Sequence, residues 1–360
     1  TGGVVGGDWS TGLLAPAARH AMLSVAEGFT TPTQARCDKL IEQHLRRSTN
    51  AEAALVVHSY GGAVWLVVQA LAGGQGVVVA KSEVNSVIRA ATGAMRREAG
   101  AIDSCTCADY EATIDDDTSL LLRVRSDACR AVGTTISTTR EELVALARDR
   151  EIATVEALDG APLCDATNSE LESANARDAL KAGIDLVVVR GEGRLGGPPA
   201  GIVLGDRPLL ERIRCHEMYS AWQLDPLRAA ALGQSLRPDN GPATPPVRQL
   251  LETSVDNLRH RAERMAVQLI DSCPRASIQA VPLTSPVAAH SDPSAALPSF
   301  GLSLVPRDGN VETLAHHLQS QPSPILCLND AQQVTLDLRT VLPAQDAQIV
   351  AALQATPDDA

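Results

Sequence analysis

The sequence predicts an α/β protein with a mostly parallel sheet of seven strands, helices on both faces of that sheet, and a smaller α+β domain at its C-terminal end. Three observations lead to this fold class. Short runs rich in Val, Ile and Leu recur along the chain, and helical patterns separate most of them. These runs are apolar throughout, which is typical of strands buried on both faces. At residues 235–247 a stretch rich in Pro indicates a linker.

The seven predicted strands share this apolar character and lie at 53–57, 76–80, about 99–102, 119–124, 153–157, 186–189 and 201–205. The helices predicted between them lie at 62–72, 83–98, 139–149 and 176–182. The segment Thr138–Glu141 has the spacing of a capping box, which would begin the third of these helices. Because ligands bind beyond the carboxyl ends of parallel strands, the loops after Val57, Ala80, Ala157 and Val189 are where we expect functional residues.

The same patterns predict three regions along the chain. They are an N-terminal arm with helices over residues 1–50, a large α/β domain over 51–240 and a small α+β domain over 246–360. In the small domain, an amphipathic pattern predicts one long helix at about 246–272. Two strands, a helix at 311–320, a hairpin and a final helix are expected to follow.

Composition and charge exclude several functional classes. The 360 residues are 44% hydrophobic and carry a net charge of −12, which disfavours a partner with a phosphate backbone. Residues 53–80 contain no charged side chain, but glycine-rich turns interrupt them, so they predict no membrane helix and no membrane association. The eight cysteines lack the paired spacing of a zinc site. We therefore expect a soluble, cytoplasmic protein with no metal site and mostly reduced thiols.

The stretch VVVRGEGRLGGPPAG places Gly191, Gly193 and Gly196 in the G-x-G-x-x-G spacing of dinucleotide-binding proteins. That fingerprint requires a helix that begins at the last glycine and points its free amides at the pyrophosphate. Here two prolines and a predicted strand follow, so the helix N-terminus is missing. We therefore reject dinucleotide binding.

The segment VVHSYGGAV places Ser59 in a turn between a predicted strand and a predicted helix. In one interpretation Ser59 is the nucleophile of a serine hydrolase. The strained turn of such enzymes needs small residues on both sides of the nucleophile, and Val57 stands at the first of those positions. In the favoured interpretation, Ser59, Tyr60, Gly61 and Gly62 begin a helix whose free amides can bind an anion.

Five segments carry a more specific signal: AEAALVVHSYGGAVWLVVQALAGGQGVVVAKSEV, DYEATIDDDTSLLLRVRSD, EELVALARDREIATVEALDGAPLCD, AGIDLVVVRGEGRLGGPPAGIVLG and LDLRTVLPAQDAQIVAAL. Together they resemble the bacterial selenocysteine synthase family, the L-seryl-tRNA(Sec) selenium transferases. The resemblance implies an aminotransferase-like fold, known as fold type I of the pyridoxal 5′-phosphate (PLP) enzymes, and transferase ancestry. It also implies PLP as the ancestral cofactor and a homo-oligomer, a dimer or larger, with the cofactor at a subunit interface.

The family's catalytic residues do not carry over to this sequence. The family stretch Ser-Gly-Asp-Lys-Leu-Leu-Gly-Gly-Pro, whose Lys forms the Schiff base with PLP, puts Gly193 at the Lys position. A second family stretch, Asp-Leu-Gly-Ser-Gly, whose Asp pairs with the pyridinium nitrogen, puts Ala157 at the Asp position. Asp159 follows on the same side of the strand but more than about 6 Å further along the chain. PLP chemistry depends on both missing groups.

The resemblance therefore implies a catalytically degenerate paralogue, or pseudoenzyme, with no catalytic residue of the PLP type and no covalently bound cofactor. The residues that the resemblance places at the phosphate end of the cofactor site are still present, as Ser59, Tyr60, Gly61 and Gly62. Lys81 stands at the position of a family Arg. A small phosphorylated ligand could bind these residues.

Two alternatives stay open. The first is an active PLP- or phospholigand-dependent transferase or lyase with a non-standard site, in which Lys81 replaces the lost lysine. The second is the serine hydrolase with Ser59 as its nucleophile. We expect no tRNA binding by this chain, because the family's N-terminal tRNA-binding region has no counterpart in the residues from Thr1 onward.

Overall fold

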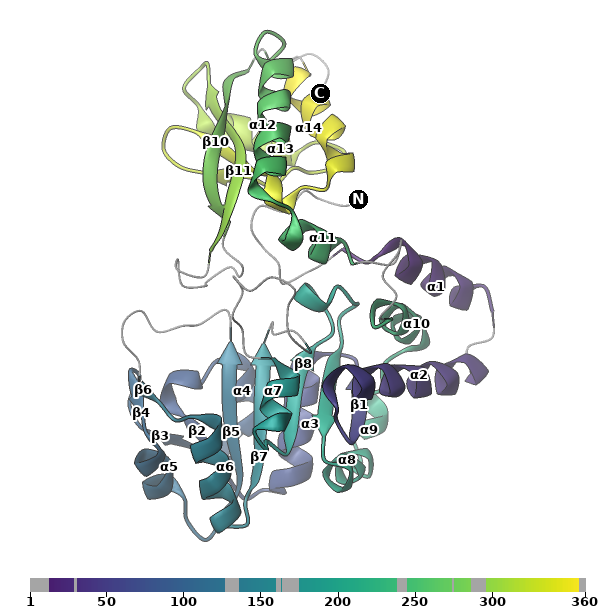
Figure 1. Ribbon diagram of the computed structural model, residues 1–360, viewed down its shortest axis with the longest axis vertical. Coiled ribbons are helices and arrows are strands. Elements are labelled where there is room, and N and C mark those ends of the chain that lie inside the picture. Colours follow the sequence, from purple (N-terminus) through teal and green to yellow (C-terminus); the bar gives the residue numbers. More distant parts are fainter. Residues whose placement is uncertain are drawn as a thin grey trace. The chain divides into compact units, whose positions relative to one another are not determined.

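The computed structural model describes residues 13–28, 31–126, 136–159, 163, 175–237, 245–273, 275–285 and 296–355. The chain forms two compact units, which divide between Val247 and Arg248 (Figure 1). Each unit has its own hydrophobic core.

The larger unit is built on a seven-stranded sheet. Its strands in chain order are β1 (Ala53–Val57), β2 (Gly76–Ala80), β3 (Arg96–Ala99), β5 (Thr118–Ser126), β7 (Ala153–Asp159), β8 (Leu186–Arg190) and β9 (Gly201–Gly205). Across the sheet the order is β1-β9-β8-β7-β5-β2-β3, and β9 is antiparallel to both of its neighbours while the other strands run parallel. The predicted mostly parallel α/β fold is confirmed. A separate short pair joins β4 (Ser104–Cys105) to β6 (Ile136–Ser137).

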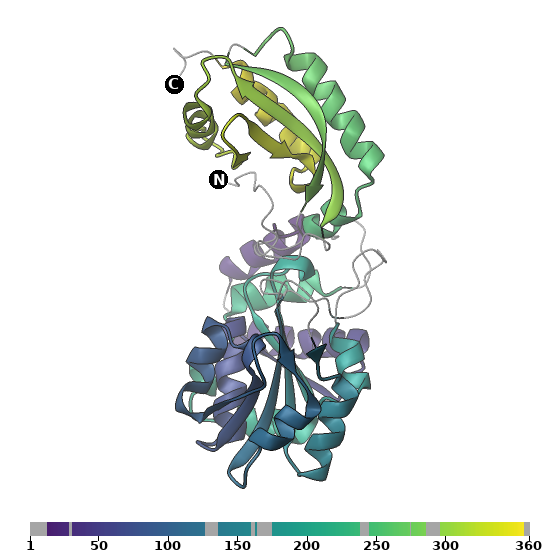
Figure 2. The same ribbon diagram turned by 90° about the vertical axis from the view of Figure 1, so that its left-hand side faces the viewer.

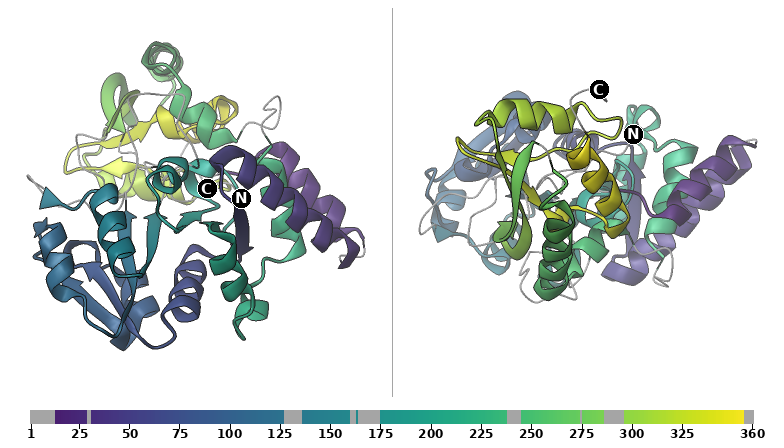
Figure 3. Two further views of the ribbon diagram at one scale, coloured as in Figure 1. Left: turned by 60° about the horizontal axis from the view of Figure 1, so that its bottom comes forward. Right: turned by 90° about the horizontal axis from the view of Figure 1, so that it is seen from above.

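Helices cover both faces of this sheet (Figures 1 and 3). The helices of this unit are α1 (Pro16–Ala26), α2 (Thr31–Thr49), α3 (Tyr60–Ala72), α4 (Ser86–Thr92), α5 (Cys107–Thr113), α6 (Arg140–Asp149), α7 (Ala176–Lys181), α8 (Arg207–Arg214), α9 (Tyr219–Trp222) and α10 (Pro226–Ser235). Because side chains alternate along a strand, Ala157 and Val188 pack on the α3 face. Leu158 and Val189 pack on the opposite face, with α2 and α7.

Two predicted helix boundaries in this unit are wrong. The helix predicted at 83–98 is only the short α4, and the strand expected at about 99–102 is β3. The helix ends early because Arg96–Ala99 pairs in parallel with β2 as the last strand of the sheet. The capping box of α6 is shifted by one residue, since Thr139 and Glu142 form it rather than the predicted Thr138 and Glu141.

The smaller unit is a four-stranded antiparallel sheet packed with helices (Figure 2), as the predicted α+β class requires. In sheet order its strands are β10 (Ala276–Ser285), β11 (Leu297–Pro306), β13 (Val334–Asp337) and β12 (Leu328–Asn329), and its helices are α11 (Pro246–Glu252), α12 (Val255–Leu269), α13 (Val311–Gln319) and α14 (Asp346–Gln354). The single long helix predicted at about 246–272 is wrong. The Ser254 side chain accepts a hydrogen bond from the Asn257 amide, and this N-cap begins α12 separately from α11.

We expect Leu122→Ala to destabilise the larger unit strongly. Leu122 lies in β5 and is fully buried, so the shorter side chain leaves a cavity that costs about 2–5 kcal/mol in the free energy of unfolding. Urea unfolding followed by circular dichroism measures this change. Leu23→Ala on α1 is the matched control, because Leu23 is 63% exposed and its loss should change stability by about 0.5 kcal/mol or less. Equal effects of the two substitutions would contradict the core assignment.

Candidate functional site

The carboxyl ends of β7 and β8 lie beside the N-terminus of α3, where ligands bind in open α/β sheets. Side-chain alternation determines which residues meet there. Asp159 has the same parity as Ala157, and Arg190 has the same parity as Val188, so both charged side chains lie on the α3 face. We call Asp159, Arg190, Glu192 and Tyr60 the Arg190 cluster.

Arg190 is the centre of this cluster. Its guanidinium Nε donates a hydrogen bond to Oδ1 of Asp159, and its Nη1 donates to Oε1 of Glu192 at 2.9 Å. The guanidinium carbon also lies 4.7 Å from the ring centroid of Tyr60, which is a cation–π distance. Burial alone would lower the pKa of Arg190, but the two carboxylates outweigh it and raise that pKa, so the guanidinium stays charged. One side chain thus joins β7, β8 and α3.

Tyr60 lies beneath the guanidinium and is almost completely buried. Its hydroxyl has no hydrogen-bond partner in the part of the chain that the structure describes. Burial, together with the negative charge of Asp159, raises the pKa of this hydroxyl above its ordinary value. Tyr60 is therefore neutral and is an apolar platform for Arg190 rather than an acid or base.

The N-terminus of α3 begins as the sequence predicts, one turn after β1. Ser59 has an extended backbone, and its Oγ accepts a hydrogen bond from the Gly62 amide at 3.1 Å. This contact confirms Ser59 as the N-cap residue. Gly201 of β9 lies against the same turn, because a Cβ atom at Gly201 would be only 2.3 Å from the Ser59 carbonyl oxygen. The glycine lets β9 approach α3 closely.

The loop between β8 and β9 contains no regular helix. A short 3₁₀ turn over Gly193–Leu195 is followed by β9, so the predicted strand after the glycines is confirmed. Glu192 accepts a hydrogen bond from the Ala200 amide at 3.1 Å and so fixes both ends of this loop. Gly193 is buried with a φ of 68°, a left-handed conformation that costs a residue with a side chain about 1–2 kcal/mol.

Arg228 on α10 connects this loop to the end of β1. Its Nη1 donates hydrogen bonds to the His58 carbonyl at 2.9 Å and to the Pro199 carbonyl at 3.3 Å. Trp222 lies on the other side of the α3 N-terminus, where a Cβ atom at Gly62 would be 2.4 Å from its ring. The first turn of α3 is therefore packed on that side by an indole.

Glu83 occupies another position at this end of the sheet, directly after β2. Its carboxylate accepts a hydrogen bond from the Val124 amide of β5 at 2.6 Å. Burial raises the pKa of Glu83 to about 7, although the Val124 amide and the nearby Arg123 partly oppose this effect. Glu83 can therefore be protonated near neutral pH.

The structure brings together only some of the residues that the sequence predicts to bind a phosphate. Ser59, Tyr60, Gly61 and Gly62 form the first turn of α3, whereas Lys81 follows β2. Tyr60 lies beneath Arg190 at the end of β8, and β2 is three strand positions from β8, so a spacing of about 4.8 Å per strand separates the two places by roughly 14 Å.

Sequence reasoning missed Arg190 and Glu192 as polar residues of this site, and it considered Asp159 only as a poor substitute for the family's aspartate. A signal was available, because Arg190 ends a fully apolar strand at its carboxyl end, where a charged residue can meet a ligand or another strand. Pairing it with Asp159 required the adjacency of β7 and β8, which the sequence does not state.

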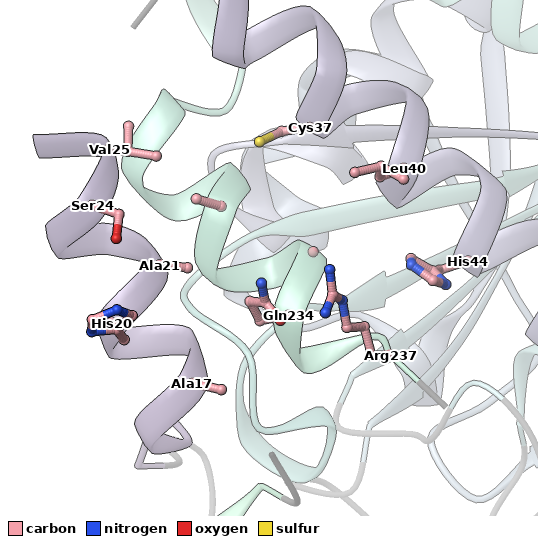
Figure 4. Close-up of a pocket in the computed structure, with 12 residues that line it drawn as sticks. Ala17, His20, Ala21, Ser24, Val25, Cys37, Leu40, His44, Gln234 and Arg237 are labelled. Atoms are coloured by element: carbon pink, nitrogen blue, oxygen red, sulfur yellow. The ribbon is translucent and has the colours of Figure 1, made fainter. Parts of the chain in front are cut away.

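A separate cavity of about 410 Å³ lies between α1, α2 and α10 (Figure 4). Its polar lining comes from all three helices and the residues after them: His20, Ser24, His44, Gln234 and Arg237. Burial and the neighbouring Arg237 and Arg47 lower the pKa of His44. The cavity shares no lining residue with the Arg190 cluster.

The described residues contain no group of three or more His, Cys, Asp or Glu side chains arranged to hold a metal ion. None of the described helices combines the length and the apolar composition needed to cross a bilayer.

Solved structures with this fold identify its class. D-glucosaminate-6-phosphate ammonia-lyase matches with a TM-score of 0.70 and 16% identity, over 98% of this chain and 95% of that one. A structure of SPT with PLP matches with a TM-score of 0.53 and 16% identity, over 97% of this chain and 85% of that one. The fold is therefore that of the PLP fold type I enzymes.

Sequence comparison narrows this class to one family. The family model for L-seryl-tRNA selenium transferase matches residues 18–342. The L-seryl-tRNA(Sec) selenium transferase of Desulfomicrobium baculatum is 30% identical over 362 residues, which cover 94% of this chain and 78% of that protein. The chain belongs to the L-seryl-tRNA selenium transferase family.

The residues that the structure describes at the carboxyl ends of β7 and β8 do not fit a PLP held as a Schiff base. The sequence contains three lysines, Lys39, Lys81 and Lys181. Lys39 lies in α2, Lys181 ends α7 at the opposite end of the sheet, and Lys81 follows β2, about 14 Å from β8 at the usual strand spacing. At these strand ends the described side chains are instead the guanidinium of Arg190 and its carboxylate partners.

We expect Glu83→Gln to remove part of the pH dependence of stability. Between about pH 4.5 and pH 7 folded Glu83 binds more protons than unfolded Glu83, so the free energy of unfolding falls as pH rises. The whole effect amounts to about 3.4 kcal/mol. Urea unfolding of wild type and variant at a series of pH values measures it, and the wild type should lose stability that the variant keeps. Glu111→Gln is the exposed control, and an identical slope in Glu83→Gln and wild type would disprove the assignment.

Proposed function

We propose that this chain is a member of its family without PLP-dependent catalysis, retained for assembly or regulation. One observation carries the proposal. Gly193 stands where the family resemblance expects the lysine that binds the cofactor, Arg190 ends β8 three residues before it, and the three lysines of the chain lie elsewhere. A guanidinium stays protonated in proteins and is no nucleophile at neutral pH, so it cannot form the imine that PLP chemistry requires.

The strand β7 supports the same proposal. Ala157, at the position of the family's aspartate, is fully buried among apolar residues on the α3 face. An alanine cannot stabilise a positive charge on a ring nitrogen, which is the property that makes PLP an electron sink. The nearest carboxylate on the same face of this strand, Asp159, already pairs with Arg190.

The proposal includes assembly and location. We propose a cytoplasmic homo-oligomer, a dimer or larger, because enzymes of the resembled family complete their cofactor site at a subunit interface. A net charge of −12 argues against tRNA as a partner of this chain. A small phosphorylated ligand at the N-terminus of α3 is compatible with the proposal, since helix amides bind anions without covalent chemistry.

We expect that PLP followed by borohydride leaves no pyridoxyl group on the folded protein at stoichiometric level. The reason is that no lysine is placed to form an imine at the carboxyl ends of β7 and β8. Intact-mass spectrometry and peptide mapping after reduction measure the outcome.

The Lys81→Arg variant is the control for a relocated Schiff base. Should wild type trap one pyridoxyl group per chain and Lys81→Arg trap none, Lys81 would be the cofactor lysine and the proposal would be wrong. Trapping that is substoichiometric and equal in both proteins would reflect surface modification and would leave the proposal standing.

We expect Ser59→Ala to lower the free energy of unfolding by about 1 kcal/mol, because it removes the N-cap of α3. As a capping residue Ser59 should also resist a fluorophosphonate probe, whereas the nucleophile of a hydrolase would react with it. Urea unfolding and probe labelling measure the two properties. Ser59→Asn should keep the cap and the stability. Covalent labelling of Ser59 in the wild type would favour the hydrolase alternative.

A further inference from the structure

We propose that Arg190 is an internal substitute for the cofactor, and that it joins the strand ends to α3 in a chain that folds without PLP. This inference rests on the proposed loss of PLP catalysis, and it adds a role for the residue that stands at the site.

Arg190 connects three elements of the larger unit. Asp159 belongs to β7, Arg190 to β8 and Tyr60 to the first turn of α3, so the guanidinium contacts three elements that converge at the carboxyl ends of the strands. Both ionic side chains are largely removed from water, with 29% of Arg190 and 16% of Asp159 exposed. Contacts of charged groups in such partly buried geometry stabilise more than those of exposed pairs.

The charges within the Arg190 cluster do not cancel. Arg190 contributes one positive charge, while Asp159 and Glu192 contribute two negative charges, so the cluster is net negative. An anionic group placed directly against the carboxylates of Asp159 and Glu192 would be repelled by this excess charge. The cluster therefore compensates its own cation and does not need an anionic ligand to do so.

The loop between β8 and β9 is held by the same cluster. Glu192 binds both Arg190 and the Ala200 amide, so the same carboxylate that holds the guanidinium also fixes the turn before β9. Gly193 within that turn has a left-handed backbone, which disfavours a lysine at this position. The loop conformation that holds Arg190 therefore disfavours a lysine at position 193 by about 1–2 kcal/mol.

The experiment is a double-mutant cycle on the full chain, prepared without PLP. Arg190→Gln, Asp159→Asn and the double variant are unfolded in urea beside the wild type. We expect each single substitution to raise the unfolding equilibrium constant about 10- to 100-fold, and the double variant to raise it by much less than the product of the two. Arg150→Gln is the matched control, because its pair with Glu111 is exposed, and we expect less than about a fivefold change.

A chemical rescue tests the same site from the other direction. In Arg190→Ala, millimolar ethylguanidinium should raise the urea midpoint, because it can occupy the vacated place between Asp159 and Tyr60. It should have no such effect on wild type or on Arg150→Ala. If Arg190→Ala does not fold, the cycle through Asp159→Asn and Arg190→Lys gives the coupling instead.

Two results would overturn this inference without touching the proposed function. One is a change in Arg190→Gln no larger than that in Arg150→Gln. The other is a rise in the urea midpoint of the wild type on addition of PLP, with no pyridoxyl group trapped by borohydride. Trapping of PLP on a lysine would instead overturn the proposed function itself.

Discussion

The burial of the central strands on both faces is the constraint on which the rest of the larger unit depends. A strand covered on both sides has apolar residues along its length, and charged side chains can be solvated or paired mainly at its ends. Glu156 in β7 and Arg123 in β5 are exceptions, and they pair with each other. The carboxylate of Glu156 is fully buried, 2.7 Å from Arg140 and 3.6 Å from Arg123. The carboxyl ends of the strands are therefore where polar chemistry gathers.

At those ends, the residue types decide what the common fold can do. Family membership establishes the fold and the ancestry of the chain. It does not establish catalysis, because activity belongs to particular side chains rather than to the scaffold. Here the side chain of Arg190 forms ion pairs with Asp159 and Glu192 of the same chain, and Tyr60 lies beneath it as an apolar platform. At these strand ends the scaffold thus supports a structural interaction between three of its elements.

The sequence predicted most of the larger unit because its signals are local. Six of the seven strands begin where expected or within one residue, since β-branched runs bounded by turns identify strands well. Helix ends were less predictable. The segment before β3 has a helical pattern, but pairing of Arg96–Ala99 with β2 decides its end. Likewise a single amphipathic pattern could not reveal that Ser254 caps a second helix.

The sequence by itself determined the fold class, the N-cap at Ser59 and the absence of a lysine after β8, because each is a matter of composition or of neighbours along the chain. Only the tertiary structure decided that Asp159 and Arg190 form an ion pair above Tyr60. These three residues are distant in sequence, and their meeting depends on strand order and on the shared parity of two adjacent strands. Strand order is set by long-range packing, which no local pattern records.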